Sequence, residues 1–237
     1  MAPPVAQIDS AAPVRSGFPD RTGCGAGGVW YGIPIEARPD VDQWMSHEHM
    51  AEGIARPGGW RGRRYRCEDP SDAQSYFGLY ETHGSEALAA GASEAKAKGR
   101  TEWTERMAPH FRDLQGGTYA YTLSSGAALG GQAATLRFPA VDSTAEETRS
   151  VLRSLFEDDV CRHPRVVSVH LLEPVKLGAI GPVAAAPGST ASVVLVEALE
   201  NDGIGHAIDV LSPVLSSFAD GELRVQRWQL IFALTNE

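Results

Sequence analysis

The chain has 237 residues, of which 43% are hydrophobic and 22% charged, the balance of an ordinary globular protein. Its net charge of -9 repels phosphate backbones, and no basic stripe offsets it, so nucleic acid is excluded as an expected partner. No apolar run approaches the roughly 20 residues that span a bilayer, so no membrane partner is expected. Three scattered cysteines, and an N-terminus without a signal-peptide pattern, favour a cytoplasmic protein.

The N-terminal half of the chain predicts one small folded unit after a flexible tail. Residues 1–27 are rich in Ala, Pro, Gly and Ser and lack a hydrophobic period, so we interpret them as the tail. Residues 28–123 form the first unit, which opens on alternating apolar residues typical of a strand. Its predicted elements are a strand at 29–36, a helix at 40–54, strands at 60–67 and 75–81, a helical region at 85–115 and a strand at 118–125.

The C-terminal half predicts the same order of elements again. Residues 124–131 are interpreted as a linker, and residues 132–237 form the second unit. Its predicted elements are a strand at 133–140, a helix at 144–160, a strand at 163–174, a long loop at 178–190, a strand at 191–199, a helix at 206–218 and a strand at 223–234.

Each unit therefore has the β-α-β-β-α-β order of a ferredoxin-like fold. A single sheet with helices on one face leaves its other face exposed, and two such sheets can cover each other. The predicted fold class is α+β, with two tandem ferredoxin-like units that form an α/β-barrel. The sequence leaves open whether the units pair within one chain or across two chains of a homodimer.

Candidate catalytic residues concentrate in the first helix. The sequence Trp44-Met45-Ser46-His47-Glu48-His49 fails the HExxH metal motif because position 51 is alanine, and no metal site is predicted. At about 100° per residue, Glu48 falls on the apolar face of the helix with Trp44, and His49 falls at its edge. A carboxylate there is paired, protonated or functional, so Glu48 either pairs with an arginine of the next strand or acts with His49 in proton transfer.

The following strands supply further candidates. Alternation in WRGRRYRC sends Arg64 to one face and Tyr65 to the other, so at least one arginine of this strand faces a covered side. Arg64 there suits a carboxylate of the protein or of a ligand, whereas a solvated edge strand is the plainer alternative. Tyr80 is a candidate proton donor or a core residue, and His110 either approaches the site or lies at the surface.

The segment from Trp44 to Glu81 resembles the W-x3-[DE]-H, PG, RRY-R and Y-x-x-L-YE pattern of the dimeric α/β-barrel superfamily, in its stress-responsive, EthD-like and catabolic members. TEWTERMAPHF resembles a later stretch of some of those proteins, and the likeness covers roughly residues 29–123. It implies a pocket between sheet and helices for a small organic molecule, with His49 as the acid/base. The second unit lacks W-x3-[DE]-H, and we predict that it is structural.

Our leading hypothesis is a lyase or isomerase without cofactors that acts on a small aromatic or carbonyl-bearing metabolite. The predicted catalytic residues are His49, Glu48, His110 and Tyr80, and the predicted substrate-binding residues are Trp44, Arg64, Tyr65 and Trp103. A haem enzyme of the same superfamily is one alternative, with His49, His110 or His170 as its axial ligand. A ligand-binding stress protein without catalysis is the other.

Overall fold

The computed structural model describes residues 21–126, 128–175 and 191–236. Within them, eight antiparallel strands form one closed barrel in the order β1-β3-β2-β8-β5-β7-β6-β4. The two halves of the chain each supply four strands, and their sheets meet at two seams, β2 against β8 and β4 against β6. The strands are Gly25–Gly32 (β1), Gly59–Cys67 (β2), Tyr76–Thr82 (β3), Arg112–Gly126 (β4), Gln132–Pro139 (β5), Val166–Pro174 (β6), Ala191–Ala198 (β7) and Arg224–Thr235 (β8).

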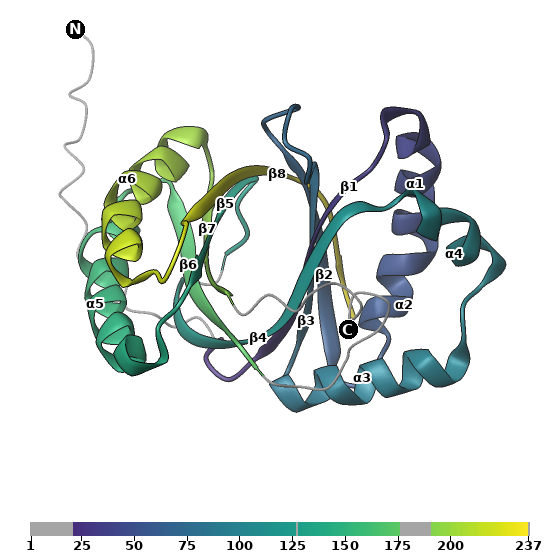
Figure 1. Cartoon of the computed structure of the whole chain (residues 1–237), viewed down its shortest axis with the longest axis horizontal. Coiled ribbons are helices and arrows are strands. Elements are labelled where there is room, and N and C mark those ends of the chain that lie inside the picture. The colour runs from purple at the N-terminus through teal and green to yellow at the C-terminus, as the bar shows by residue number, and fades with distance from the viewer. Residues whose placement is uncertain (1–20, 127, 176–190, 237) are drawn as a thin grey trace, which may run out of the picture.

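Helices cover the outside of the barrel on two opposite sides (Figure 1). The first half supplies the short segments η1 (Ile35–Ala37), α1 (Arg38–Trp44), η2 (Met45–His49), α2 (Met50–Ile54), α3 (Ser85–Lys98), α4 (Glu102–Met107) and η3 (Ala108–His110). The second half supplies η4 (Asp142–Thr144), α5 (Ala145–Asp158), η5 (Val160–Arg162) and α6 (Asn201–Phe218). This arrangement confirms the predicted α+β barrel of two tandem ferredoxin-like units.

Three apolar clusters follow from the alternation of side chains along the strands. One lies between the second sheet and α5 and α6, and one lies between the first sheet and α1, η2 and α2. The third fills the middle of the barrel lumen with aromatic and aliphatic side chains, among them Trp30, Phe77, Tyr119 and Trp228. Both faces of each sheet are therefore covered over most of their area.

Several predicted boundaries shift in the structure. β1 begins at Gly25 and ends at Gly32, so residues 25–27 belong to the strand and not to the tail, and Pro34 lies beyond it. β4 continues to Gly126, which takes residues 124–126 out of the predicted linker. Residues 1–20 of the predicted tail and the predicted loop at 178–190 lie outside the described residues.

Two helical predictions also change. The helical region predicted at 85–115 ends at Met107 and a short turn at His110, after which residues 112–115 already pair within β4. Helix α6 begins at Asn201, five residues before the predicted start, and it continues through Pro213. Among the described residues, no helix combines the length and apolar character needed to cross a membrane.

Candidate active site

The residues predicted in the first unit meet between its sheet and the segment α1–η2–α2. β1, β2 and β3 present Tyr31, Arg64 and Tyr80 on the side of the sheet that this segment covers. The helix approaches closely because β2 carries Gly62 beneath it. A Cβ atom there would lie 2.8 Å from Met50 Cε and 3.0 Å from Ile54 Cγ2.

The turn η2 is a π-helical turn, and it brings the two predicted site residues of the helix together. The Met50 amide donates to the Met45 carbonyl, five residues earlier. In an unbroken α-helix, residues five apart point about 140° away from each other, and a π turn removes most of that difference. Trp44 and His49 therefore stack, with ring centroids 4.2 Å apart and 23° between their planes.

His49 is neutral and free to bind. Burial, together with the positive charge of Arg56, lowers the pKa of His49 to about 4, against the opposing effect of Glu48. The imidazole therefore has one donor and one acceptor nitrogen at neutral pH. Among the described residues, neither nitrogen has a hydrogen-bond partner.

Tyr80 lies beside His49 in an edge-to-face contact with ring centroids 6.1 Å apart. Its hydroxyl also has no partner in the described part of the chain. Burial raises the pKa of Tyr80, so the phenol stays protonated and can donate. The ring fits over the helix because residue 53 is glycine, where a Cβ would lie 2.5 Å from Tyr80 Cε1.

Arg64 is held on three sides by the protein. It donates through Nε to the Tyr31 hydroxyl at 2.9 Å, and its Nη1 pairs with Asp42 Oδ1 at 2.5 Å. Its guanidinium lies 4.3 Å over the ring of Tyr76. Its Nη2 is buried and has no hydrogen-bond partner within the described residues. One donor of an otherwise fixed guanidinium is therefore available to a ligand.

Within the described residues Glu48 pairs with no arginine, which corrects one of the two roles predicted for it. Its Oε1 accepts hydrogen bonds from Thr101 Oγ1 at 2.6 Å, Trp44 Nε1 at 3.1 Å and Thr104 Oγ1 at 3.3 Å. Thr101 also caps α4, because its hydroxyl accepts from the Thr104 amide. Glu48 thus fastens α4 to the helix that carries His49, and it influences His49 through its charge.

The other predicted residues are divided between two places. Trp103 packs in the outer apolar cluster of the first unit, and His110 ends η3 next to Phe111, which contacts Tyr31. Tyr65 points to the opposite side of the sheet, into the lumen, where its hydroxyl donates to Glu197 Oε1 at 3.2 Å. The structure therefore separates Tyr65 from His49, as alternation along β2 requires.

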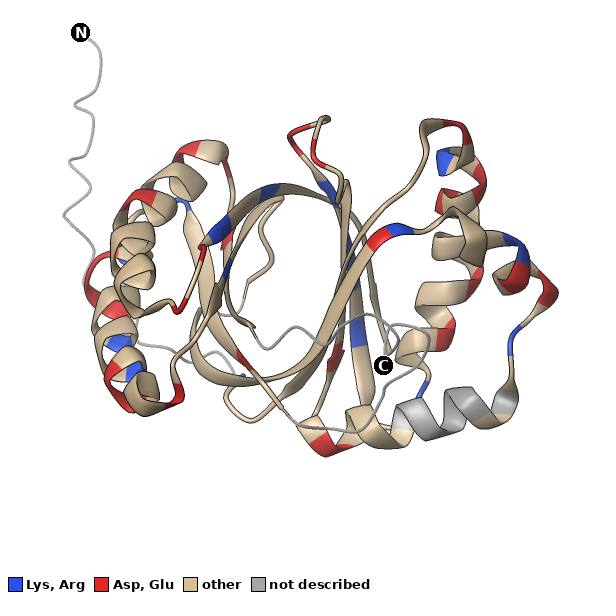
Figure 2. Cartoon of the chain, in the orientation of Figure 1, with Lys and Arg blue, Asp and Glu red and all other residues tan. Residues whose placement is uncertain are grey.

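One end of the lumen holds a buried ionic cluster that the sequence did not indicate as a unit. Glu81 pairs with Arg61 Nε at 2.5 Å, with Arg63 Nε at 3.0 Å and with Arg21 Nη1 at 3.5 Å. Arg63 reaches across to the second half, where its Nη1 lies 2.7 Å from Glu197 Oε2. Figure 2 shows Lys and Arg both on barrel strands and on the helices, whereas most Asp and Glu lie on helices and loops.

The arginines around Glu81 change the pKa of its carboxyl group. Burial alone would raise it, but Arg63, Arg61 and Arg21 outweigh burial and lower the pKa of Glu81 to about 2. The sequence signal for the cluster was the alternation that places Arg61 and Arg63 on one face of β2 and Glu81 on the corresponding face of β3. The contribution of Glu197 from the second half had no local signal.

Comparison with known proteins identifies the fold. No family model matches the chain, and no curated protein does. Solved structures do match over nearly its full length. An anthrone oxidase-like protein has a TM-score of 0.66 and 9% identity, covering 92% of this chain and 96% of that one. An inferred monooxygenase from Fusobacterium nucleatum has a TM-score of 0.60 and 6% identity, covering 91% and 98%.

A mutant chlorite dismutase from Candidatus Nitrospira defluvii matches with a TM-score of 0.52 and 10% identity, covering 89% of this chain and 92% of that one. At such identities the likeness shows the fold and no more. The chain has the dimeric α/β-barrel fold, with both halves of the barrel on one polypeptide.

His170, one of the three histidines considered as an axial haem ligand, does not fit that role. In the lumen, His170 Nδ1 lies 2.8 Å from Ser124 Oγ, and its Nε2 lies 3.4 Å from Arg21 Nη1, so both nitrogens are occupied. The His49 ring is stacked on Trp44 and faces the edge of Tyr80. Within the described residues, no group of three or more His, Cys, Asp or Glu side chains is arranged to hold a metal ion.

Proposed function

We propose that the chain is an enzyme that moves a proton on a small aromatic or carbonyl-bearing metabolite, with His49 as the base. The observation that carries this proposal is the state of His49, a neutral imidazole without a hydrogen-bond partner among the described residues, fixed between Trp44 and Tyr80. The His49 side chain is only partly buried, so a ligand can reach its ring nitrogens. An unoccupied donor and acceptor are what a ligand needs.

The surroundings of His49 favour a flat, aromatic substrate. Trp44, Tyr31, Tyr76, Tyr80 and Phe111 supply aromatic surface on the helix and the strands around it. Aromatic rings bind other rings through stacked and edge-to-face contacts. Of the charged groups nearby, Arg64 is neutralised by its ion pair with Asp42, and Arg56 acts on His49 through its charge.

With a pKa of about 4, His49 is a weak base in the free protein. The charge that forms on the substrate during the reaction raises this pKa. Removing a proton from carbon beside a carbonyl, or from a phenol, creates an oxyanion. That negative charge beside the imidazolium raises the pKa of His49 as the proton is transferred. The free Arg64 Nη2 and the Tyr80 hydroxyl are the donors available to such an oxyanion.

Removal of a proton by His49 can be the first step of several reactions. An isomerase or lyase reprotonates or fragments the carbanion, which is the reaction class that the sequence favours. An oxidase reacts the carbanion with dioxygen, and the anthrone oxidase-like structural neighbour makes anthrone a sensible probe. Proton abstraction is therefore the step to test, because all of these reactions share it and diverge only after it.

The experiment measures exchange of the anthrone methylene protons for deuterium in D2O, without oxygen, by NMR. The wild-type chain should accelerate exchange, and His49→Gln should remove the acceleration by about 10²–10⁴-fold, the usual contribution of a general base. His47→Gln is the matched control, because His47 is exposed on the same turn. Circular dichroism confirms that both variants fold.

Three outcomes contradict the proposal. Equal exchange with wild-type protein and without protein, for anthrone and for a panel of phenols and ketones, points to binding without catalysis. Exchange that survives His49→Gln assigns the base to another residue. A parallel loss in His47→Gln attributes the effect to the helix and not to His49.

A further inference from the structure

Buried arginines at the two ends of the barrel lumen differ in their partners. At one end, Arg61 and Arg63 are paired with the carboxylates of Glu81 and Glu197. At the other end, Arg137 of β5 is 5% exposed, and among the described residues it has no carboxylate within ion-pair distance. The aromatic middle of the lumen lies between the two ends.

The side chains that accept hydrogen bonds from Arg137 are all neutral, and the nearest carboxylate acting on it, Asp72, is not within ion-pair distance. Its Nη1 donates to Gln115 Oε1 at 3.0 Å, and its Nη2 donates to Gln74 Oε1 at 2.7 Å and to Gln226 Oε1 at 2.8 Å. The guanidinium lies 4.4 Å over the ring of Trp30. Its Nε is buried without a hydrogen-bond partner in the described part of the chain.

A buried cation without an anion is an unusual arrangement. Amide oxygens satisfy donors but carry no charge, and an unpaired buried charge is strongly destabilising. Burial, together with the neighbouring charge of Arg224, lowers the pKa of Arg137 to about 10, against the opposing effects of Tyr119 and Asp72. The side chain still carries its charge at neutral pH. The polypeptide has therefore placed a cation, an open donor and an aromatic ring together, with no anion in direct contact and Asp72 acting only from beyond Gln226.

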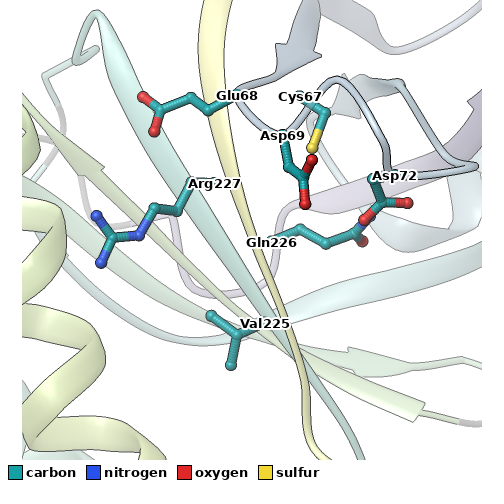
Figure 3. A pocket seen from close by; sticks show the side chains of 7 residues that line it. All are labelled: Cys67, Glu68, Asp69, Asp72, Val225, Gln226 and Arg227. Carbon is teal, nitrogen blue, oxygen red and sulfur yellow. The ribbon is translucent and has the colours of Figure 1, made fainter.

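A surface hollow of about 410 Å³ borders this end of the lumen (Figure 3). Gln226 links the two, because its Oε1 accepts from Arg137 while its Nε2 donates to Asp72 Oδ2 at 2.8 Å. Asp72 in turn pairs with Arg224. The hollow is lined by Cys67, Glu68, Asp69, Asp72, Val225, Gln226 and Arg227.

Three carboxylates against one arginine give the hollow a negative lining, which selects among anions. Phosphate, sulfate and polycarboxylates are repelled, whereas a ligand with one negative charge and a neutral or positive remainder is tolerated. A carboxylate also matches the planar fork of a guanidinium.

We infer that Arg137 is a binding site for the carboxylate of a small monocarboxylate, which replaces one or more of the three glutamine oxygens at this end of the barrel lumen. The site is separate from His49, which lies on the outer side of the sheet, and the inference does not rest on the proposed function. The ligand supplies the charge that Glu81 and Glu197 supply at the opposite end.

Gln115→Glu tests the inference, because Gln115 is exposed and one atom exchange places a carboxylate at Arg137 Nη1. The variant should raise the thermal midpoint of the ligand-free protein and weaken acetate and benzoate binding by about tenfold or more. Gln43→Glu, an exposed position on α1, adds the same charge elsewhere and should change neither. Binding is measured by calorimetry at constant ionic strength, with phosphate and citrate as comparison anions.

Other results overturn the inference. If the wild-type protein binds neither acetate nor benzoate at concentrations on the order of 100 mM, it has no such site. Equal affinity in Gln115→Glu places the anion elsewhere, and a thermal midpoint that stays the same or falls shows that Arg137 was already compensated. Phosphate or citrate binding as tightly as acetate contradicts the assigned monocarboxylate.

Discussion

Replacing Glu81 with Gln removes the acceptor around which Arg21, Arg61 and Arg63 gather in the lumen. The amide keeps the shape of the side chain but not its charge, and it leaves buried guanidinium groups with one carboxylate, Glu197, between them. Removing one partner of a buried ion pair costs about 3–5 kcal/mol. We expect Glu81→Gln to lower the free energy of unfolding by about that amount at pH 7.

The pH dependence of stability gives a second estimate of what Glu81 contributes to the free energy of unfolding. The pKa of Glu81 falls from 4.5 to about 2 on folding because its arginine partners outweigh burial. A carboxyl whose pKa is depressed stabilises the fold fully above pH 4.5 and loses this contribution as the pH falls toward 2. At about 1.36 kcal/mol per unit, the loss is on the order of 3 kcal/mol.

Urea unfolding measured between pH 7 and pH 2.5 tests both magnitudes. The wild type should lose stability steeply below pH 4.5, and Glu81→Gln should be less stable at pH 7 but less steep below pH 4.5. Glu222→Gln, at an exposed position, should behave as the wild type. A loss of less than about 1 kcal/mol in the free energy of unfolding of Glu81→Gln would contradict this ion-pair role of Glu81, as would a stability curve below pH 4.5 parallel to that of the wild type.

Two further predictions concern the outer site. Glu48→Ala strips three donors of their acceptor, so it should lower stability by about 1–3 kcal/mol and increase hydrogen exchange in α4, whereas unchanged exchange there would show that Glu48 does not hold that helix. Gly62→Val puts a side chain where Met50 and Ile54 already lie and should cost about 1–3 kcal/mol in chemical denaturation. Gly205→Ala in α6 meets open space and should be neutral or stabilising, and equal losses in the two variants would contradict this packing argument.

The order of strands and helices was predictable because hydrophobic alternation and helix periodicity can be read from short stretches of sequence. The order of eight strands and their helices followed from these patterns, and the closure of the barrel followed from the need to cover two sheet faces. The start of β1 was missed for a local reason as well. Its first residues are Gly-Ala-Gly-Gly, which have weak strand propensity, and the strand forms there through pairing with β3 and β4.

The candidate site was predictable in its members and not in its geometry. A helical wheel assumes one angle per residue, and the π turn at Met45–His49 breaks that assumption at the residues that matter. The wheel therefore put Glu48 at the centre of the buried face, whereas the structure turns it toward Thr101 and Thr104. Contacts between distant segments, such as Arg63 with Glu197, leave no trace in a local pattern.

The most direct test of the account is the rate of deuterium exchange into anthrone, compared between His49→Gln and His47→Gln. Both variants lose one imidazole from the same turn of helix, and only His49 stacks on Trp44 with its nitrogens free among the described residues. We expect exchange near the wild-type rate in His47→Gln and a loss of about 10²-fold or more in His49→Gln. Equal rates in the two variants would contradict this expectation.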